Sequence, residues 1–248
     1  MEAVAFSIAP NTKVIHLMHG LPSFDIRAAA RTLETIQYFP VGYHVCVVDP
    51  GVGTKRRGII IKTKRGDYFI GPDNGIFIPA VKILGGYEKV VEITNRKYML
   101  EPVSPIFHGR DVFTPAAAHL SIGVKIEEFG KEIKFESLVK APYCEAVLSG
   151  DVLEAEVIQI NKYGSLHLNI LNKQWNKFAA GKNKFVVAQF KKQKIKLPCV
   201  ETFGDVEINS PLILKDDYGR VEVAVNMGNF AAVYGIKIGD KCIMKKPR

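Results

Sequence analysis

The sequence predicts an α/β fold in two domains. An N-terminal α/β layered domain with a central, mostly parallel sheet is expected at residues 1–145, and a small C-terminal all-β barrel at 146–248. Strand-like and helix-like segments alternate over the first 140 residues, as in layered α/β domains. Continuous apolar runs there are typical of strands buried on both faces. Beyond about residue 141 helical periodicity is nearly absent, which favours a barrel or sandwich.

Local patterns predict the elements of the N-terminal domain in order. Asp25 can cap a helix that runs to about Gln37, because apolar residues recur there with helical spacing, and Pro40 stops it. A second helix is expected within 111–122, since Pro115 suits a first turn. Strands are expected at 14–17, 45–48 and 58–61.

The C-terminal domain is predicted from short strand-like segments separated by Gly, Asn and Asp turns. These segments are 152–160, 166–170, 185–190, 221–225 and 242–244. Neither internal repeats nor low-complexity tracts interrupt them.

Composition excludes several classes of protein. The chain has 248 residues, 34 Lys+Arg against 25 Asp+Glu, a net charge of +9 and 47% hydrophobic residues, so a disordered chain is excluded. No apolar run approaches the ~20 residues of a membrane span. Glu2 and Ala3 lead into a short apolar run without the basic start of a signal peptide. We therefore expect a soluble, cytoplasmic protein with no membrane partner.

Cysteine and histidine spacing gives little support for a metal site. Four cysteines stand far apart, which predicts four separate thiols in a reducing compartment rather than a zinc or disulfide framework. His16 and His19 form an HxxH pair, but a strand there would place them on opposite faces. We therefore expect no metal.

Lysines are concentrated between residues 162 and 196, where nine occur without one acidic residue. Lys194 and Lys196 flank Ile195 with the period of a strand. A solvated edge strand, on which lysines block sheet-to-sheet pairing, is favoured. Nucleic-acid binding is the weaker alternative, since no arginine–aromatic alternation supports it.

Two segments carry most of the chemistry. Residues 49–57 (Asp-Pro-Gly-Val-Gly-Thr-Lys-Arg-Arg) follow a buried strand, where α/β proteins keep their sites, and match neither a Walker A loop nor a dinucleotide fingerprint. Asp49 and Arg56 stand seven residues apart across this Gly-rich turn, which is more than a structural turn requires. Residues 107–115, with His108, form a second loop that enters a helix.

These two segments, with Gly-Pro-Asp-Asn-Gly at 71–75, resemble the S-adenosyl-L-methionine hydroxide adenosyltransferase family, relatives of fluorinating and chlorinating enzymes. Further matches at 22–26, 38–40 and 221–226 extend the resemblance over essentially the whole chain. It implies hydrolysis of S-adenosylmethionine to adenosine and methionine without metal or other cofactor. It also implies a homotrimer, with substrate between one subunit's first domain and its neighbour's second.

The family's hydrolytic members hold a water with an Asp–Arg–His set, which matches Asp49, Arg56 and His108. The halogenating branch has an aromatic in place of this Asp, a hydroxyl residue in place of this His, and an extra loop, so the resemblance disfavours halide chemistry. A sulfonium leaves as neutral methionine, so neither a general acid nor a metal is required. Placing water in line with the C5′–S bond can supply roughly 7–11 kcal/mol at best. Which residue accepts the proton stays open.

The resemblance also implies substrate-binding residues. Phe24 lies in one family motif, and Asn161, Tyr163 and Ser165 align with a family segment commonly read Asp-x-Phe-Gly-Asn. The change to Asn161 removes a charge that could meet the substrate ammonium. Matches to the stretch whose backbone reads adenine are Val225, Asn226 and Met227. The alternative is that these residues only build barrel strands.

Family members begin with a strand and a Thr-Asp-Phe-Gly-type segment whose Asp holds the ribose hydroxyls. Met1 to Val4 resemble an internal stretch beyond it, so either the start lies upstream or this strand and anchor are absent. A binding protein that retains adenosine or S-adenosylmethionine without turnover is therefore a second hypothesis. A basic nucleic-acid module is a third.

Overall fold

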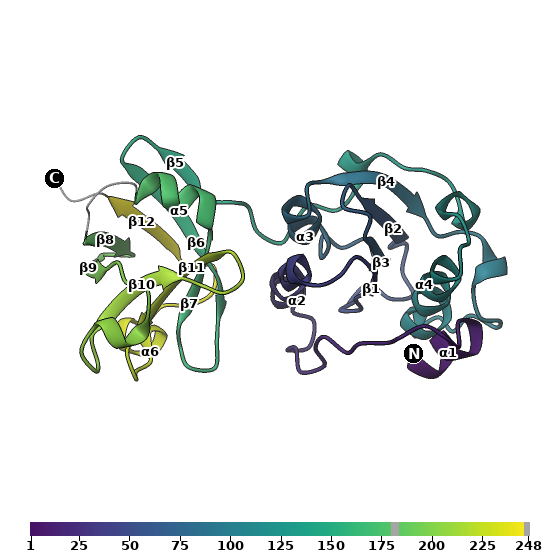
Figure 1. Ribbon diagram of the computed structural model, residues 1–248, viewed down its shortest axis with the longest axis horizontal. Coiled ribbons are helices and arrows are strands. Elements are labelled where there is room, and N and C mark those ends of the chain that lie inside the picture. Colours follow the sequence, from purple (N-terminus) through teal and green to yellow (C-terminus); the bar gives the residue numbers. More distant parts are fainter. Residues whose placement is uncertain (180–183, 246–248) are drawn as a thin grey trace. The chain divides into compact units, whose positions relative to one another are not determined.

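The computed structural model describes residues 1–179 and 184–245, and the chain divides into two compact units, Met1–Pro142 and Tyr143–Arg248 (Figure 1). From the sequence we expected the division at 145/146. Each unit is described by itself.

The first unit is built on a four-stranded sheet in the order β1-β3-β2-β4. Its strands are β1 (Tyr43–Val45), β2 (Gly58–Thr63), β3 (Tyr68–Pro72) and β4 (Tyr87–Glu92). Only the β1–β3 pair is parallel, and β2 pairs antiparallel with both β3 and β4. The prediction of a mostly parallel sheet is therefore not supported. The reason is local: a tight turn with Gly66 at φ +103 joins β2 to β3 as a hairpin, and a hairpin is antiparallel.

Helices cover both sides of this sheet, with α2 and α3 on one side and α4 on the other (Figure 1). The bounds are α1 (Glu2–Ile8), α2 (Ile26–Leu33), α3 (Ile78–Ile83) and α4 (Thr114–Ser121). As predicted, Asp25 caps α2: its Oδ1 accepts the amide N–H of Ala28 at 2.8 Å. A 3₁₀ turn, Glu34–Tyr38, continues α2 as far as the Pro40 region.

Shorter helical turns complete this unit. A π-helical turn, Gly109–Phe113, precedes α4, which carries Pro115 in its first turn as expected. Three 3₁₀ turns span Arg96–Tyr98, Ile126–Phe129 and Phe135–Ser137. One core cluster joins sheet, π-helical turn and α4 through Ile60, Ile70, Val91, Phe113 and Phe129.

The predicted strand at 14–17 does not form. This segment makes no backbone hydrogen bond with another strand of the described residues, and Ile15 and Met18 are exposed. Its irregular path also corrects the expectation that His16 and His19 face apart: His16 Nδ1 lies 2.8 Å from His19 Nε2. Within residues 1–179 and 184–245, no group of three or more His, Cys, Asp or Glu side chains is arranged to hold a metal ion.

The second unit is a nearly closed antiparallel barrel, as predicted. Its sheet runs β10-β11-β7-β6-β12-β8-β9, with β5 paired to β6. A bridge between Cys199 and Ile213 brings the end of β9 to β10. The strands are β5 (Val147–Ser149), β6 (Val152–Ile160), β7 (Leu166–Leu171), β8 (Phe185–Phe190), β9 (Gln193–Pro198), β10 (Pro211–Lys215), β11 (Arg220–Val225) and β12 (Lys241–Lys245).

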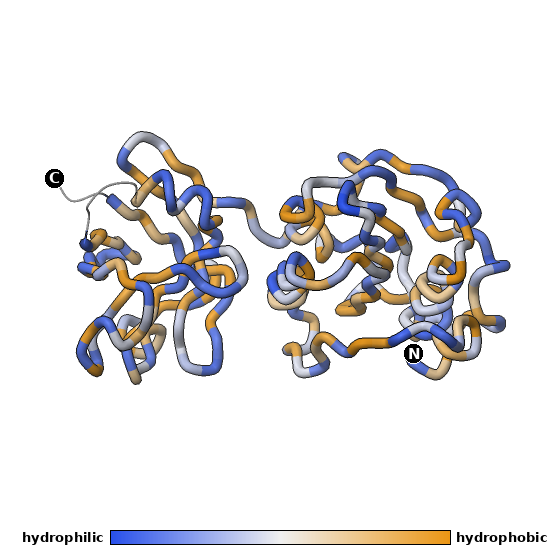
Figure 2. The backbone as a smooth tube through the Cα atoms, viewed as in Figure 1, coloured by the Kyte–Doolittle hydropathy of each residue, from blue (hydrophilic) through white to orange (hydrophobic). Residues whose placement is uncertain are grey.

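Two helices, α5 (Asn172–Phe178) and α6 (Phe230–Tyr234), and a 3₁₀ turn, Phe203–Asp205, complete the barrel unit. Apolar strand residues fill its interior, among them Leu166, Leu168, Val221, Val223 and Met244. In Figure 2 the strands carry most of the hydrophobic colouring of this unit, and the turns are mostly hydrophilic.

The lysines at the end of the 162–196 run lie on a solvated strand. On β9 both Lys194 and Lys196 are exposed, whereas Ile195 between them is buried, which confirms the period-2 pattern. Lys196 Nζ lies 4.1 Å from the centre of the Phe185 ring. Lys182, which belongs to the same run, lies outside the described residues.

The four cysteines are free thiols, as expected. Burial raises the pKa of the Cys46 thiol to about 12 and that of Cys199 to about 11, so both stay protonated and unreactive at neutral pH. None of the helices in the described part of the chain combines the length and the apolar character that crossing a bilayer requires.

Glycine at position 75 is required by a close contact. Gly75 has φ +88, and a Cβ there would lie 2.1 Å from the carbonyl oxygen of Lys140. Gly85 has a similar φ of +90 with open space around it. We expect Gly75→Ala to lower the free energy of unfolding by more than about 3 kcal/mol, against about 1–2 kcal/mol for Gly85→Ala. Urea denaturation checks this, and equal losses in the two variants would contradict the contact.

Candidate active site

The conformation of the loop between β1 and β2 depends on its glycines and on the hydroxyl group of Thr54. Thr54 Oγ1 donates to the carbonyl of Gly51 at 2.7 Å and accepts the amide N–H of Arg56 at 3.2 Å. Gly53 has φ +75, and a Cβ there would lie only 2.6 Å from the carbonyl oxygen of Pro105. Glycine therefore lets this loop contact the loop that precedes His108.

Asp49 and Arg56 form a buried, two-pronged ion pair. Arg56 Nε donates to Asp49 Oδ1 at 3.1 Å, and Nη2 donates to Oδ2 at 2.6 Å. The two side chains are 8% (Arg56) and 4% (Asp49) exposed. The guanidinium also lies 5.2 Å from the centre of the Phe113 ring, which anchors it to the domain core. Its planar fork is thereby held in a single orientation.

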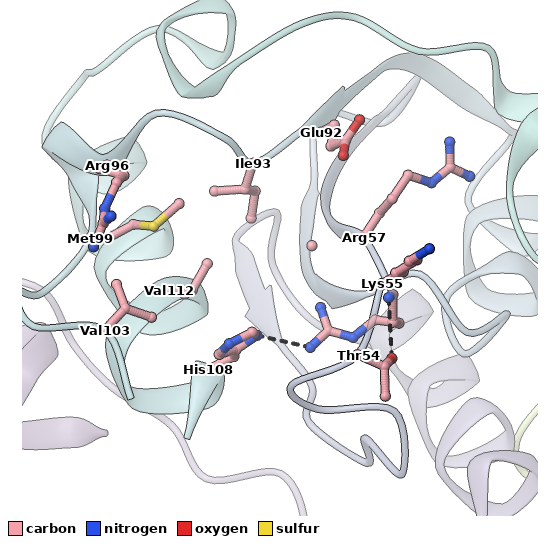
Figure 3. A pocket seen from close by; sticks show the side chains of 12 residues that line it. Thr54, Lys55, Arg57, Glu92, Ile93, Arg96, Met99, Val103, His108 and Val112 are labelled. Carbon is pink, nitrogen blue, oxygen red and sulfur yellow. Dashed lines mark hydrogen bonds between the residues drawn. The ribbon is translucent and has the colours of Figure 1, made fainter. Parts of the chain in front are cut away.

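His108 completes the cluster from the N-terminal end of the π-helical turn. The same Arg56 Nη2 lies 3.1 Å from His108 Nδ1 (dashed line in Figure 3). A guanidinium can only donate, so Nδ1 is the acceptor and the neutral imidazole carries its hydrogen on Nε2. Burial, and then the charge of Arg56, lower the pKa of His108, and Asp49 and Asp111 only partly oppose this shift. His108 is therefore neutral at physiological pH.

The three residues form a wall shared by two pockets, because His108 lines both. The smaller pocket, of about 120 Å³, is lined by Asp49 and His108 together with apolar residues of the two loops. The larger, of about 430 Å³, is lined by Arg56 and His108 (Figure 3). The predicted catalytic residues are thus brought together, beside two spaces that solvent or ligand can enter.

A second Asp–Arg–His cluster lies in the same unit and was not anticipated. Arg65 Nε and Nη2 donate to Asp67 at 2.7 and 2.9 Å, and His44 Nε2 contacts Asp67 Oδ1 at 2.9 Å. Burial raises the pKa of Asp67, but hydrogen bonds from Arg65 and His44 outweigh it and hold the pKa at about 2. None of the three lines either pocket.

The predicted binding turn of the second unit is held by Asn161. Its Oδ1 accepts the amide N–H groups of Tyr163 and Ser165 at 3.0 and 3.1 Å. Ser165 is buried, and the Tyr163 ring is exposed, with Lys162 Nζ 4.9 Å from its centre. The Asn161 side chain is therefore occupied in shaping the turn.

His167 and Asp216 support this turn and were missed from the sequence. His167 Nε2 lies 3.5 Å from Asn161 Nδ2, and His167 Nδ1 lies 2.9 Å from Asp216 Oδ2. Both His167 and Asp216 are buried. The available signal was the alternation in Leu166-His167-Leu168-Asn169, which places two polar side chains opposite the barrel core.

The remaining predicted binding residues differ in what they can offer a ligand. Val225 is buried in the barrel core, and both backbone groups of Asn226 are bonded to the 209–210 segment. Met227 is 83% exposed at φ +55, and its backbone makes no hydrogen bond with another described residue. Phe24, in the first unit, is 75% exposed at φ +65. Exposed residues with such strained backbones are often functional.

The matching family models cover most of the chain. Residues 1–130 match the SAM hydroxide adenosyltransferase N-terminal domain, and residues 155–243 match the C-terminal domain of the same family.

Relatives of known name cover nearly the full length. An (R)-S-adenosyl-L-methionine hydrolase of Salinispora tropica is 35% identical over 243 residues, which is 97% of this chain and 89% of the relative. A fluorinase of an Actinoplanes species is 24% identical, over 96% of this chain and 89% of the relative. The crystal structure of an uncharacterized conserved protein from Thermotoga maritima superposes with a TM-score of 0.89 at 30% identity, covering 99% of this chain and 93% of that chain. The chain therefore belongs to the SAM hydroxide adenosyltransferase family.

Proposed function

We propose that this protein hydrolyses S-adenosyl-L-methionine to adenosine and L-methionine, by attack of a positioned water at ribose C5′. The observation that carries the proposal is the hydrogen-bonded chain Asp49–Arg56–His108 between two pockets. Relatives at 33–35% identity over nearly the whole chain are named as hydrolases of this substrate.

The geometry assigns different tasks to the three residues. His108 holds its hydrogen on Nε2, so it orients the water by donating to it and does not accept its proton. Asp49 is then the proton acceptor, because a carboxylate keeps lone pairs beyond the two that Arg56 occupies. Arg56 holds both neighbours and stabilises hydroxide character on the attacking oxygen.

The bond changes need no further group. The water oxygen forms a bond to C5′ while the C5′–S bond breaks, and its electron pair stays on sulfur as the neutral thioether of methionine. One proton is released for each substrate cation consumed. We accordingly propose a reaction without metal or cofactor, in which positioning of the water supplies most of the barrier reduction.

Substrate contacts are proposed at the positions that offer free groups. Phe24 and Tyr163 supply exposed aromatic faces for the adenosine, and Met227 supplies free backbone groups. Because these residues lie in different units of the chain, we propose a homotrimer with the site at subunit interfaces. Four free thiols favour a cytoplasmic setting.

The direct test is to incubate the purified protein with S-adenosylmethionine, without added metal or halide, and to quantify products by chromatography. Equimolar adenosine and methionine are expected. Tight binding of S-adenosylmethionine without product would instead indicate a binding protein and overturn the proposal.

Substitution of the water-holding residues tests the assignment. We expect Asp49→Asn and His108→Ala each to lower kcat by about 10²–10⁴-fold, because each removes a group that acts on the attacking water. Asp67→Asn is the matched control, since Asp67 also pairs with an Arg and a His but lines neither pocket. It should lower stability and leave kcat unchanged. Wild-type turnover in either active-site variant would refute the assignment.

The protonation of His108 gives an independent readout. Because its pKa is lowered, His108 should take up a proton only at a more acid pH than an ordinary histidine, and turnover should fall there. Arg56→Gln removes the second cause of the shift, so the pKa of His108 should rise. Histidine NMR titration measures this directly. The pKa of His119 is lowered by burial and Lys97, so its titration should not change, and an unmoved His108 would contradict the Arg56 contact.

A further inference from the structure

The wall formed by the catalytic residues has two sides of unlike chemistry. Among the described residues, His108 alone lines both pockets. Asp49 faces the smaller pocket, and Arg56 lines the larger one. A displacement at carbon brings the nucleophile in opposite the leaving group, so substrate and water approach from different sides. The structure therefore raises the question of which pocket admits which reactant.

The larger pocket is unsuited to a sulfonium. Four basic residues and one acidic residue line it: Lys55, Arg56, Arg57, Arg96 and Glu92. The arginines are paired with Asp49, Asp73 and Glu101, but Lys55 is exposed and forms no ion pair with a described residue. The remaining charge is positive. It disfavours a cationic substrate and favours water with hydroxide character.

The opposite wall of the larger pocket is mostly apolar, with Arg96 next to Met99 (Figure 3). Met99, Val103 and Val112 lie across from Lys55 and Arg57, with His108 between the two sides (Figure 3). These apolar side chains offer no negative group that would attract a sulfonium. A pocket of about 430 Å³ with such walls can hold several waters next to His108 and Arg56.

The smaller pocket has the features that the substrate needs. It places the Asp49 carboxylate next to a rim of exposed apolar residues: Val47 is 37% exposed, Ile106 77% and Phe107 44%. A negative group favours the approach of a cation, and an apolar rim can cover a ribose and a base. With about 120 Å³ of its own, this pocket has room for the reacting centre, and its apolar rim for the rest of the ligand.

We infer that the larger pocket is the entry chamber for the nucleophile, from which water reaches His108 and Arg56 while substrate closes the smaller pocket. This inference rests on the proposed function. The proton that Asp49 takes from the attacking water passes on to a solvent water, which restores the carboxylate.

Filling the chamber away from the catalytic wall tests the inference. Val103→Trp should lower kcat by about tenfold or more while KM for S-adenosylmethionine stays unchanged, because water supply and not substrate binding is obstructed. Adenosine affinity, measured by calorimetry, should also be unchanged. The matched control is Val41→Trp, since Val41 is 56% exposed and lines neither pocket; it should match wild type in every measurement. Met99→Phe serves as a second obstruction if Val103→Trp fails to fold.

Two results would overturn the inference. Adenosine affinity reduced by tenfold or more would show that the larger pocket holds substrate. Unchanged kcat with a filled pocket would show that water arrives by another route. Failure of the proposed function is distinguishable, because it appears as absence of turnover in the wild-type protein, and adenosine binding by Val103→Trp then still reports which pocket the ligand occupies.

Discussion

The orientation of one guanidinium determines the chemistry of this site. Arg56 donates through Nε and Nη2 to Asp49, and through Nη2 to His108. Since arginine has no acceptor atom and keeps its charge, it holds both oxygens of Asp49 by hydrogen bonds and fixes His108 as the Nε2–H tautomer. A lysine at this position would provide a point charge without the planar fork, and both neighbours could then rotate.

The same three residue types have different hydrogen-bond roles when their order in the hydrogen-bonded chain changes. In the second cluster the carboxylate of Asp67 lies between Arg65 and His44, so the histidine donates to an anion. In the site, the arginine lies between the other two, and the histidine must accept. Burial and Arg56 then lower the pKa of His108 together. Residue composition therefore does not define the site; the order of the hydrogen-bonded chain does.

Short-range sequence patterns predicted the elements that depend on short-range interactions. The Asp25 cap, the barrel strands other than β5 and β10, and the two loops with Asp49, Arg56 and His108 follow from short-range spacing. The prediction of a mostly parallel sheet was wrong, because the direction of a strand depends on the strand with which it pairs. The Arg65-Gly66 turn is typical of a hairpin and was the local signal for the antiparallel pair. The alternation around His167 signalled a polar side chain there, but its bond to Asp216 joins residues 49 apart in sequence, and no spacing rule reveals that pairing.

A buried ion pair contributes little to stability by itself, because removing two charges from water offsets their attraction. The Asp49–Arg56 pair is nevertheless almost fully buried, and the structure around it restricts its movement: the Gly53–Pro105 approach fixes one loop on the other, and Phe113 covers the guanidinium. Such rigid support is what positioning of a poor nucleophile requires. The position of the pair beside both pockets accounts for this rigid, buried arrangement. A mobile pair would not keep the contents of the two pockets apart, and it would leave the water without a fixed line of attack.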